Sequence, residues 1–138
     1  MLNVLIADSH PVARDGLHML VEKVVVGHGD ECLIAYCDDA LTAFRKAKRL
    51  QPDLILLSSN LHPSGGAHTV LALRAYAPRA TLLIVTDDDE EALRGCVEAG
   101  ADGVLSKRES PAAIEERLSL VLLELWQAAG NRPPVSLR

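Results

Sequence analysis

The stretch Leu54-Ile55-Leu56-Leu57-Ser58 decides the fold of this 138-residue chain. Four consecutive aliphatic residues follow Pro52-Asp53 and end at the polar run Ser58-Ser59-Asn60. Such a run is too short for a helix, and without alternating polar residues it predicts a strand buried on both faces. Ser58 then leaves the strand at the carboxyl edge of a sheet, where open α/β sheets bind their ligands.

Four further apolar runs repeat this pattern along the chain, and segments with helical periodicity separate them. The expected strands are residues 4–7, 32–35, 54–57, 81–85 and 103–105. The expected helices are residues 11–21, 40–50, 69–76, 90–99 and 111–128, each with apolar residues three and four positions apart. Parallel strands need crossover helices that cover both faces of the sheet. The alternation therefore predicts an α/β protein, a flavodoxin-like (βα)5 doubly wound parallel sheet with strand order 2-1-3-4-5.

The size and charge of the chain limit what it can be. Its length suits one domain, which we place at residues 1–129, with residues 130–138 as a linker or tail because Pro133-Pro134 cannot continue a helix. The 19 acidic side chains outnumber the 14 basic ones and give a net charge of -5. This charge opposes contact with a phosphate backbone, so we expect no direct nucleic-acid binding by this segment.

The amino terminus and the cysteines indicate a cytoplasmic protein. Residues 1–6 enter a strand-like run directly, without the basic region, long apolar stretch and cleavage site of an export signal. We therefore expect no membrane attachment. Cys32, Cys37 and Cys96 are odd in number and lack the spacing of metal ligands, so we interpret them as reduced packing residues.

Four segments together resemble the receiver domain of response regulators, in order and at the spacing of that family. They are VLIADSHP at residues 4–11, PDLILLS at 52–58, IVT at 84–86 and AGADGVLSK at 99–107. The run DSHPVARDGL at 8–17 is most similar to the NarL/LuxR-type branch. The resemblance implies a CheY-like fold and a role in two-component signal transduction or a phosphorelay. It also implies the N-terminal part of a LuxR-type transcription regulator, in which a DNA-binding helix-turn-helix usually follows the receiver.

The resemblance also assigns the site residues. In the family, two acidic residues after the first strand hold Mg²⁺, an aspartate after the third strand accepts phosphate, and a Thr or Ser and a Lys bind the phosphoryl oxygens. Asp8, Thr86 and Lys107 match three of these positions. Ser9 replaces the second acid and Ser58 replaces the phosphoacceptor. The chain is thus expected to be a pseudo-receiver with a degenerate phosphorylation pocket, no catalytic residue and no enzymatic activity.

The substitutions change the charge of that pocket. The family's three carboxylates against one lysine become Asp8 against Lys107, so the site is formally neutral. Mg²⁺ gives up its water reluctantly and is held by carboxylates together with phosphate oxygens. We therefore expect weak or absent Mg²⁺ binding and no cofactor. An unpaired buried ammonium is costly, which predicts an ion pair between Lys107 and Asp8.

Two further positions bear on switching and access. Val104 stands where receivers usually carry an aromatic residue that swings inward on activation, so the bistable element of the switch is missing. Asp87 follows Thr86 where the family commonly has a small residue. Its charge repels phosphate, and it equally suits the start of the following helix.

The last predicted helix is apolar around more of its circumference than one buried face needs. An inward stripe is accompanied by Leu120, Leu123 and Trp126, which widen the apolar arc. We interpret these three residues as a surface for a protein partner and expect a homodimer through this helix. The alternative is a large contact within the chain plus a few exposed leucines.

Three functions remain open on the sequence. The first is a phosphorylation-independent regulatory interaction module. The second is a small-ligand or metal sensor that uses the cleft at the carboxyl edge, with His10 and His62 nearby. The third is a phosphoreceiver with an unusual acceptor, in which Asp8 would have to activate Ser58, since an unassisted serine is a poor nucleophile for phosphotransfer.

Overall fold

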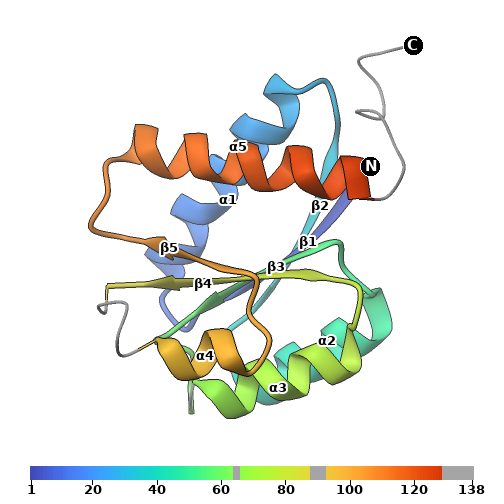
Figure 1. Cartoon of the computed structure of the whole chain (residues 1–138), viewed down its shortest axis with the longest axis vertical. Helices are drawn as coiled ribbons and strands as arrows, with labels where there is room; N and C mark the ends of the chain where they lie inside the picture. Colours follow the sequence, from blue (N-terminus) through green and yellow to red (C-terminus); the bar gives the residue numbers. More distant parts are fainter. Residues whose placement is uncertain (64–65, 88–92, 129–138) are drawn as a thin grey trace.

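The computed structural model describes residues 1–63, 66–87 and 93–128. Five strands form one parallel sheet in the order β2-β1-β3-β4-β5. The strands are β1 (Leu2–Ala7), β2 (Cys32–Cys37), β3 (Leu54–Ser58), β4 (Thr81–Thr86) and β5 (Gly103–Ser106), and the helices are α1 (Pro11–Gly27), α2 (Ala40–Leu50), α3 (Ala67–Tyr76), α4 (Arg94–Glu98) and α5 (Pro111–Ala128). Helices α1 and α5 cover one face of the sheet, and α2, α3 and α4 cover the other (Figure 1). The predicted fold class and strand order are confirmed.

Strand β3 is the centre of both cores. All five of its residues are buried. Ile55 and Leu57 pack into the core beneath α2 and α3, whereas Leu54 and Leu56 pack into the core beneath α1 and α5. This is the two-sided burial that its uninterrupted apolar run predicts.

Helices α1 and α3 each differ from the prediction at one boundary. Helix α1 continues to Gly27 instead of ending at residue 21, because Val24 and Val25 extend its buried stripe by further turns. Helix α3 begins at Ala67, two residues before the predicted start. The predicted start of the fourth helix at residue 90 lies outside the described residues, which show α4 at Arg94–Glu98.

The turn into β5 is held by an arginine from α3. Gly100 adopts a φ of 123°, and a Cβ there would lie 3.4 Å from the Cγ of Arg74. The Arg74 guanidinium donates to the Gly100 carbonyl at 2.7 Å and pairs with the Asp102 carboxylate at 2.7 Å. That carboxylate also accepts the Leu82 N–H at 2.8 Å. Through these contacts the segment from Ala99 to Gly103 connects α3, β4 and β5.

Trp126 is buried within the chain, so the expectation that it faces a partner is wrong. It is 3% exposed, and its ring meets the His28 ring edge-on at a centroid distance of 5.4 Å. His28 lies just beyond the end of α1, so the unpredicted turns of that helix provide the cover. Leu123 is half-buried against the same core, and Leu120 is 58% exposed. Of the three residues, Leu120 alone is an exposed apolar side chain.

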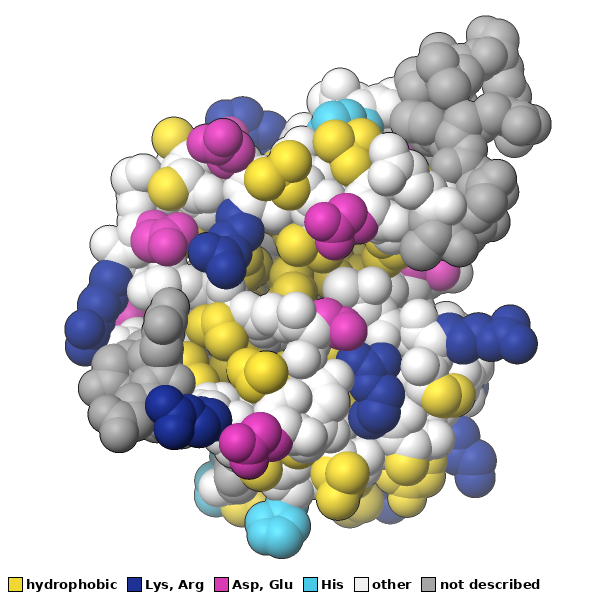
Figure 2. Space-filling model, viewed as in Figure 1, with side chains coloured by type: hydrophobic (Ala, Val, Ile, Leu, Met, Phe, Trp, Pro, Cys, Tyr) yellow, Lys and Arg dark blue, Asp and Glu magenta, His cyan; other side chains and the backbone are white. Residues whose placement is uncertain are grey.

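The surface carries mixed charges, and the cysteines are free thiols. Charged side chains of both signs are mixed on the face shown in Figure 2, and hydrophobic side chains gather in the hollow beneath α5. None of the helices described is long and apolar enough to cross a membrane. The three cysteines are free thiols, and burial raises the pKa of Cys37 to about 12.

We expect Trp126→Ala to lower the free energy of unfolding by about 3–5 kcal/mol, because it empties a buried site between α1 and α5. Chemical denaturation followed by far-ultraviolet circular dichroism measures the loss. The matched control Leu120→Ala, on the exposed side of the same helix, should cost less than about 1 kcal/mol. Equal losses in the two variants would contradict the burial of Trp126.

Candidate functional site

The predicted site residues meet at the carboxyl edge of the sheet. Ser58 and Thr86 are the last residues of β3 and β4, while Asp8 and Lys107 directly follow β1 and β5. The backbone fixes this arrangement, since Lys107 donates its N–H to the Thr86 carbonyl at 2.8 Å and Ser59 donates to the Val85 carbonyl at 3.0 Å. Asp8, Ser58 and Thr86 have no exposed surface.

The predicted ion pair between Lys107 and Asp8 is present. The Lys107 Nζ lies 3.9 Å from the Asp8 Oδ2, which is close enough for strong attraction but too far for a hydrogen bond. The Asp8 Oδ1 accepts the His10 N–H at 2.8 Å. The Asp8 Oδ2 is buried and has no hydrogen-bond partner among the described residues. The pair therefore balances charge and leaves hydrogen-bonding capacity unused.

Ser58 is held in a local turn. Its Oγ accepts the Asn60 N–H at 3.1 Å. Within the described part of the chain, no hydrogen bond links this hydroxyl to Asp8. A serine nucleophile needs an adjacent general base within hydrogen-bond reach. The arrangement does not supply that base.

Ser59 is a site residue that sequence reasoning missed. Its Oγ donates to the Thr86 Oγ1 at 2.8 Å and links the ends of β3 and β4. The available signal was the pair of hydroxyl residues at the end of the central strand. Ser58 is the last residue of β3 and Ser59 is the first of the following turn, and their hydroxyls bond to different neighbours.

The Ser9 hydroxyl connects the loop after β1 to two other loops. Its hydroxyl donates to the Asp38 carbonyl at 2.7 Å, in the loop between β2 and α2. The same oxygen accepts the His62 N–H at 2.8 Å, in the loop after β3. The His62 carbonyl in turn accepts the Ala40 N–H at 2.8 Å. A carboxylate at position 9 could not donate to the Asp38 carbonyl, so Ser9 supplies a contact that an acidic residue lacks.

The described residues do not assemble a metal centre at this edge. No group of three or more His, Cys, Asp or Glu side chains in residues 1–63, 66–87 and 93–128 could hold a metal ion. His10 and His62 are both exposed. Mg²⁺ prefers oxygen ligands, and of the residues 8 and 9 that follow β1 only Asp8 offers a carboxylate.

The positions linked to switching and access are only partly described. Val104 is half-buried and packs against the core beneath α2 and α3. Asp87 is exposed just after β4. The acidic residues 88–91, which the sequence places at the start of the fourth helix, lie outside the described residues.

The sequence is similar to known regulators over most of its length. Residues 4–119 match the family model described as response regulator receiver domain. The nitrate/nitrite response regulator protein NarP of Escherichia coli is 34% identical over 116 residues, which cover 83% of this chain and 52% of NarP. The oxygen regulatory protein NreC of Staphylococcus epidermidis is 28% identical over 128 residues, covering 91% of this chain and 55% of NreC. The chain thus spans about half the length of the curated relatives it matches.

Solved structures give the same result. A LuxR-family two-component response regulator from Aurantimonas sp. SI85-9A1 superposes with a TM-score of 0.76 at 25% identity, covering 96% of this chain and 88% of that one. The signal receiver domain of the putative response regulator NarL from Mycobacterium tuberculosis superposes with a TM-score of 0.70 at 26% identity, covering 89% and 96%. The fold, the residues at its carboxyl edge and these matches together show that the chain belongs to the response regulator receiver family, with relatives of the NarL/LuxR type.

Proposed function

We propose that this receiver domain works without phosphorylation, as a regulatory interaction module in a NarL/LuxR-type transcription regulator. The observation that carries the proposal is Ser58, a buried serine at the end of β3 where the family resemblance places the phosphoacceptor. Its hydroxyl accepts the Asn60 N–H, and no hydrogen bond among the described residues joins it to Asp8. Phosphotransfer to such a group lacks both the carboxylate nucleophile and the means to activate a substitute.

The position of the second acid supports the same proposal. Ser9 has a hydroxyl that joins the Asp38 carbonyl and the His62 N–H, so its oxygen already holds two loops in place. Of the two positions after β1 that hold Mg²⁺ in the family, Asp8 alone offers a carboxylate, and the Lys107 Nζ lies 3.9 Å from its Oδ2. A formally neutral site attracts Mg²⁺ too weakly to offset the cost of removing water from the ion.

The switch elements favour a fixed conformation. The Thr86 Oγ1 accepts a hydrogen bond from Ser59 at 2.8 Å, which links this hydroxyl to β3. Val104 has no ring to exchange between an inward and an outward position. A ligand shifts an equilibrium only when it binds two states differently, and both the covalent ligand and the moving aromatic residue are missing in this proposal.

The output of such a domain is contact with proteins. NarP and NreC are regulators by name, and we carry that role over to this chain as a proposal. The burial of Trp126 leaves Leu120, with half-buried Leu123 beside it, as the apolar surface of α5 for a second copy. No enzymatic activity is proposed.

We expect the wild-type chain to keep its unmodified intact mass after incubation with acetyl phosphate and Mg²⁺, because no hydrogen bond within the described residues joins Ser58 to a general base. Intact-mass spectrometry is the measurement, with a receiver that carries the full acidic set treated in parallel as a positive control. A phosphoryl group on the wild type that disappears in Ser58→Ala would overturn the proposed function.

We expect Ser58→Asp alone to remain poorly phosphorylated, because position 9 still lacks the second acid. The double variant Ser9→Asp/Ser58→Asp should be phosphorylated more than the single variant, and only with Mg²⁺. Ser9→Asp should also lower the free energy of unfolding by about 1–3 kcal/mol, since it loses the donor to the Asp38 carbonyl. Efficient labelling of Ser58→Asp would show that Ser9 does not limit the site.

We expect a concentration-dependent dimer in sedimentation velocity at micromolar concentration, weakened by Leu120→Lys. The charged side chain would have to be buried between the two copies. Leu71→Lys is the matched control, because Leu71 is an exposed leucine on α3, and this variant should leave the association unchanged. A purely monomeric wild type removes homodimerisation through α5 and leaves a different protein as the partner.

A further inference from the structure

The part of the chain that contains α2 and α3 carries the opposite charge from the rest. Residues 40–80 hold six basic side chains and one acidic one, a net charge of +5, although the whole chain has a net charge of -5. The remaining residues hold eight basic and eighteen acidic side chains. Asp53, the one acid of this segment, accepts the Asn3 N–H at 2.8 Å and belongs to neither helix. Positive charge is therefore concentrated on one part of an acidic protein.

The exposed side chains of these two helices form one surface, which we call the basic face. Helices α2 and α3 lie side by side on the sheet (Figure 1), and the Phe44 and Tyr76 ring centroids are 5.8 Å apart. The Gln51 side chain donates to the Tyr76 carbonyl at 2.8 Å and joins the carboxyl ends of the two helices. The basic face consists of Leu41, Arg45, Lys48 and Arg49 of α2, Leu71 of α3 and Arg79, all of them exposed.

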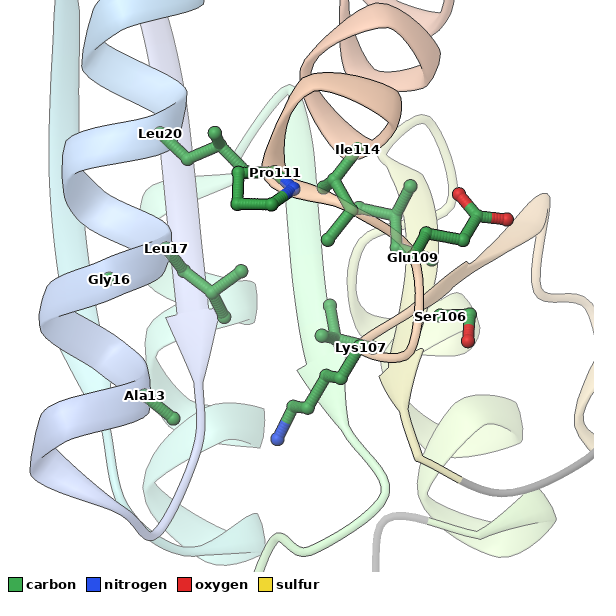
Figure 3. A pocket seen from close by; sticks show the side chains of 11 residues that line it. Ala13, Gly16, Leu17, Leu20, Ser106, Lys107, Glu109, Pro111 and Ile114 are labelled. Carbon is green, nitrogen blue, oxygen red and sulfur yellow. The ribbon is translucent and has the colours of Figure 1, made fainter.

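The charges of the basic face differ from that of the lysine at the carboxyl edge of the sheet. The Lys107 ammonium, shown in Figure 3, lies 3.9 Å from the Asp8 Oδ2. By contrast, Lys48, Arg49 and Arg79 form no ion pair with any carboxylate in the described part of the chain. Their charges are therefore available to a partner.

The helix dipole accounts for only part of this pattern. Lys48 and Arg49 occupy the last turn of α2, where the negative end of the dipole favours cations. Arg45 lies in the middle of the helix, where the dipole has little effect. The dipole equally favours acids in the first turn, and neither α2 nor α3 has one there. Helix stability alone therefore does not produce a basic surface without acids.

The basic face also presents apolar side chains, which restrict the chemistry of the partner. Leu41 is 57% exposed and Leu71 is 59% exposed. A partner that complements this face offers apolar groups beside its negative charges. The phosphate backbone of a nucleic acid offers charge alone, whereas a protein segment that combines carboxylates with apolar side chains offers both.

The acids around the basic face limit the size of the partner. Helix α2 has 11 residues and is therefore ~16 Å long. The exposed Asp38 lies two residues before it, and most acids of the chain lie outside residues 40–80. A DNA duplex or an anionic membrane extends far beyond one helix, so its phosphates approach these acids within the Debye length of ~8 Å. A short protein segment covers the basic face without this repulsion.

We propose that the basic face binds an acidic amphipathic segment of a partner protein, with carboxylates at Lys48, Arg49 and Arg79 and apolar side chains on Leu41 and Leu71. Complementary charges speed the encounter and orient the segment. This proposal rests on the protein contact named in the proposed function and assigns it a surface other than α5. Peptide binding is measured without phosphorylation or dimerisation, so each proposal fails on its own measurement.

The test uses a fluorescein-labelled peptide of about 14 residues, with glutamate and leucine at helical spacing, which is long enough to span α2. The full 138-residue chain is titrated into it, and fluorescence anisotropy reports binding. We expect saturable binding at micromolar concentration that weakens as salt is raised, because salt screens exposed charges. Replacing every glutamate by glutamine, or every leucine by alanine, should each weaken binding at least about fivefold.

Variants locate the binding. Lys48→Glu/Arg49→Glu should bind the peptide at least about tenfold more weakly, since two attractive contacts become repulsive. Arg108→Glu/Arg117→Glu is the matched control, because it changes the net charge equally at exposed positions outside the basic face, and it should stay within about twofold of the wild type. Far-ultraviolet circular dichroism checks that both variants are folded. The milder Lys48→Gln/Arg49→Gln should weaken binding about threefold.

Three outcomes contradict the proposal. Absence of saturable binding by the acidic peptide, or equal losses in the two charge-reversal variants, overturns the basic face as the site. Equal affinity for the leucine-free peptide overturns the amphipathic character of the partner. Tighter binding, at the same salt, of a DNA duplex or of vesicles of phosphatidylcholine and phosphatidylserine overturns the choice of a protein partner.

Discussion

The burial of β3 on both faces is the constraint on which the rest of the structure depends. Leu54 and Leu56 require cover from α1 and α5, while Ile55 and Leu57 require it from α2 and α3. Each fully buried aliphatic side chain contributes about 1.5–3 kcal/mol, so this strand alone outweighs any single polar contact at its end. The fold therefore brings Asp8, Ser58, Thr86 and Lys107 together whether or not they carry chemistry, and an altered site can persist on an unaltered scaffold.

The same physics explains which site residues can be exchanged. Asp8 is buried with Lys107 as its ion-pair partner, and removing one partner of a buried pair costs about 3–5 kcal/mol. Each therefore holds the other in place. Ser9 and Ser58 are neutral and satisfied by backbone groups of nearby loops, so neither leaves a charge stranded. Burial and charge thus distinguish the Asp8–Lys107 pair from the two serines.

The sequence predicted what depends on periodicity and charge. Uninterrupted apolar runs indicated buried parallel strands, and the cost of an unpaired ammonium indicated the contact between Lys107 and Asp8. It could not predict the burial of Trp126, because an apolar arc does not reveal whether the cover comes from the same chain or another. The loop contacts of Ser9 were equally hidden, since its partners are the Asp38 carbonyl and the His62 N–H, and any residue type provides those groups.

The interface between α1 and α5 lies beside the site at the carboxyl edge of the sheet. In our proposal the route through Thr86 is closed, since its hydroxyl is bonded to Ser59 and Val104 carries no ring to move. The interface of α1 and α5 instead combines an open cleft with polar links between the helices, from His28 to Ser119 at 2.6 Å and from Lys23 to Glu115 at 2.8 Å. On α1 these links lie toward the end remote from Lys107, whereas on α5 Glu115 directly follows Ile114 of the cleft and Ser119 lies one turn further on. The contacts between α1 and α5 therefore extend from the carboxyl edge of the sheet to the end of α1, and α5 also carries the exposed Leu120.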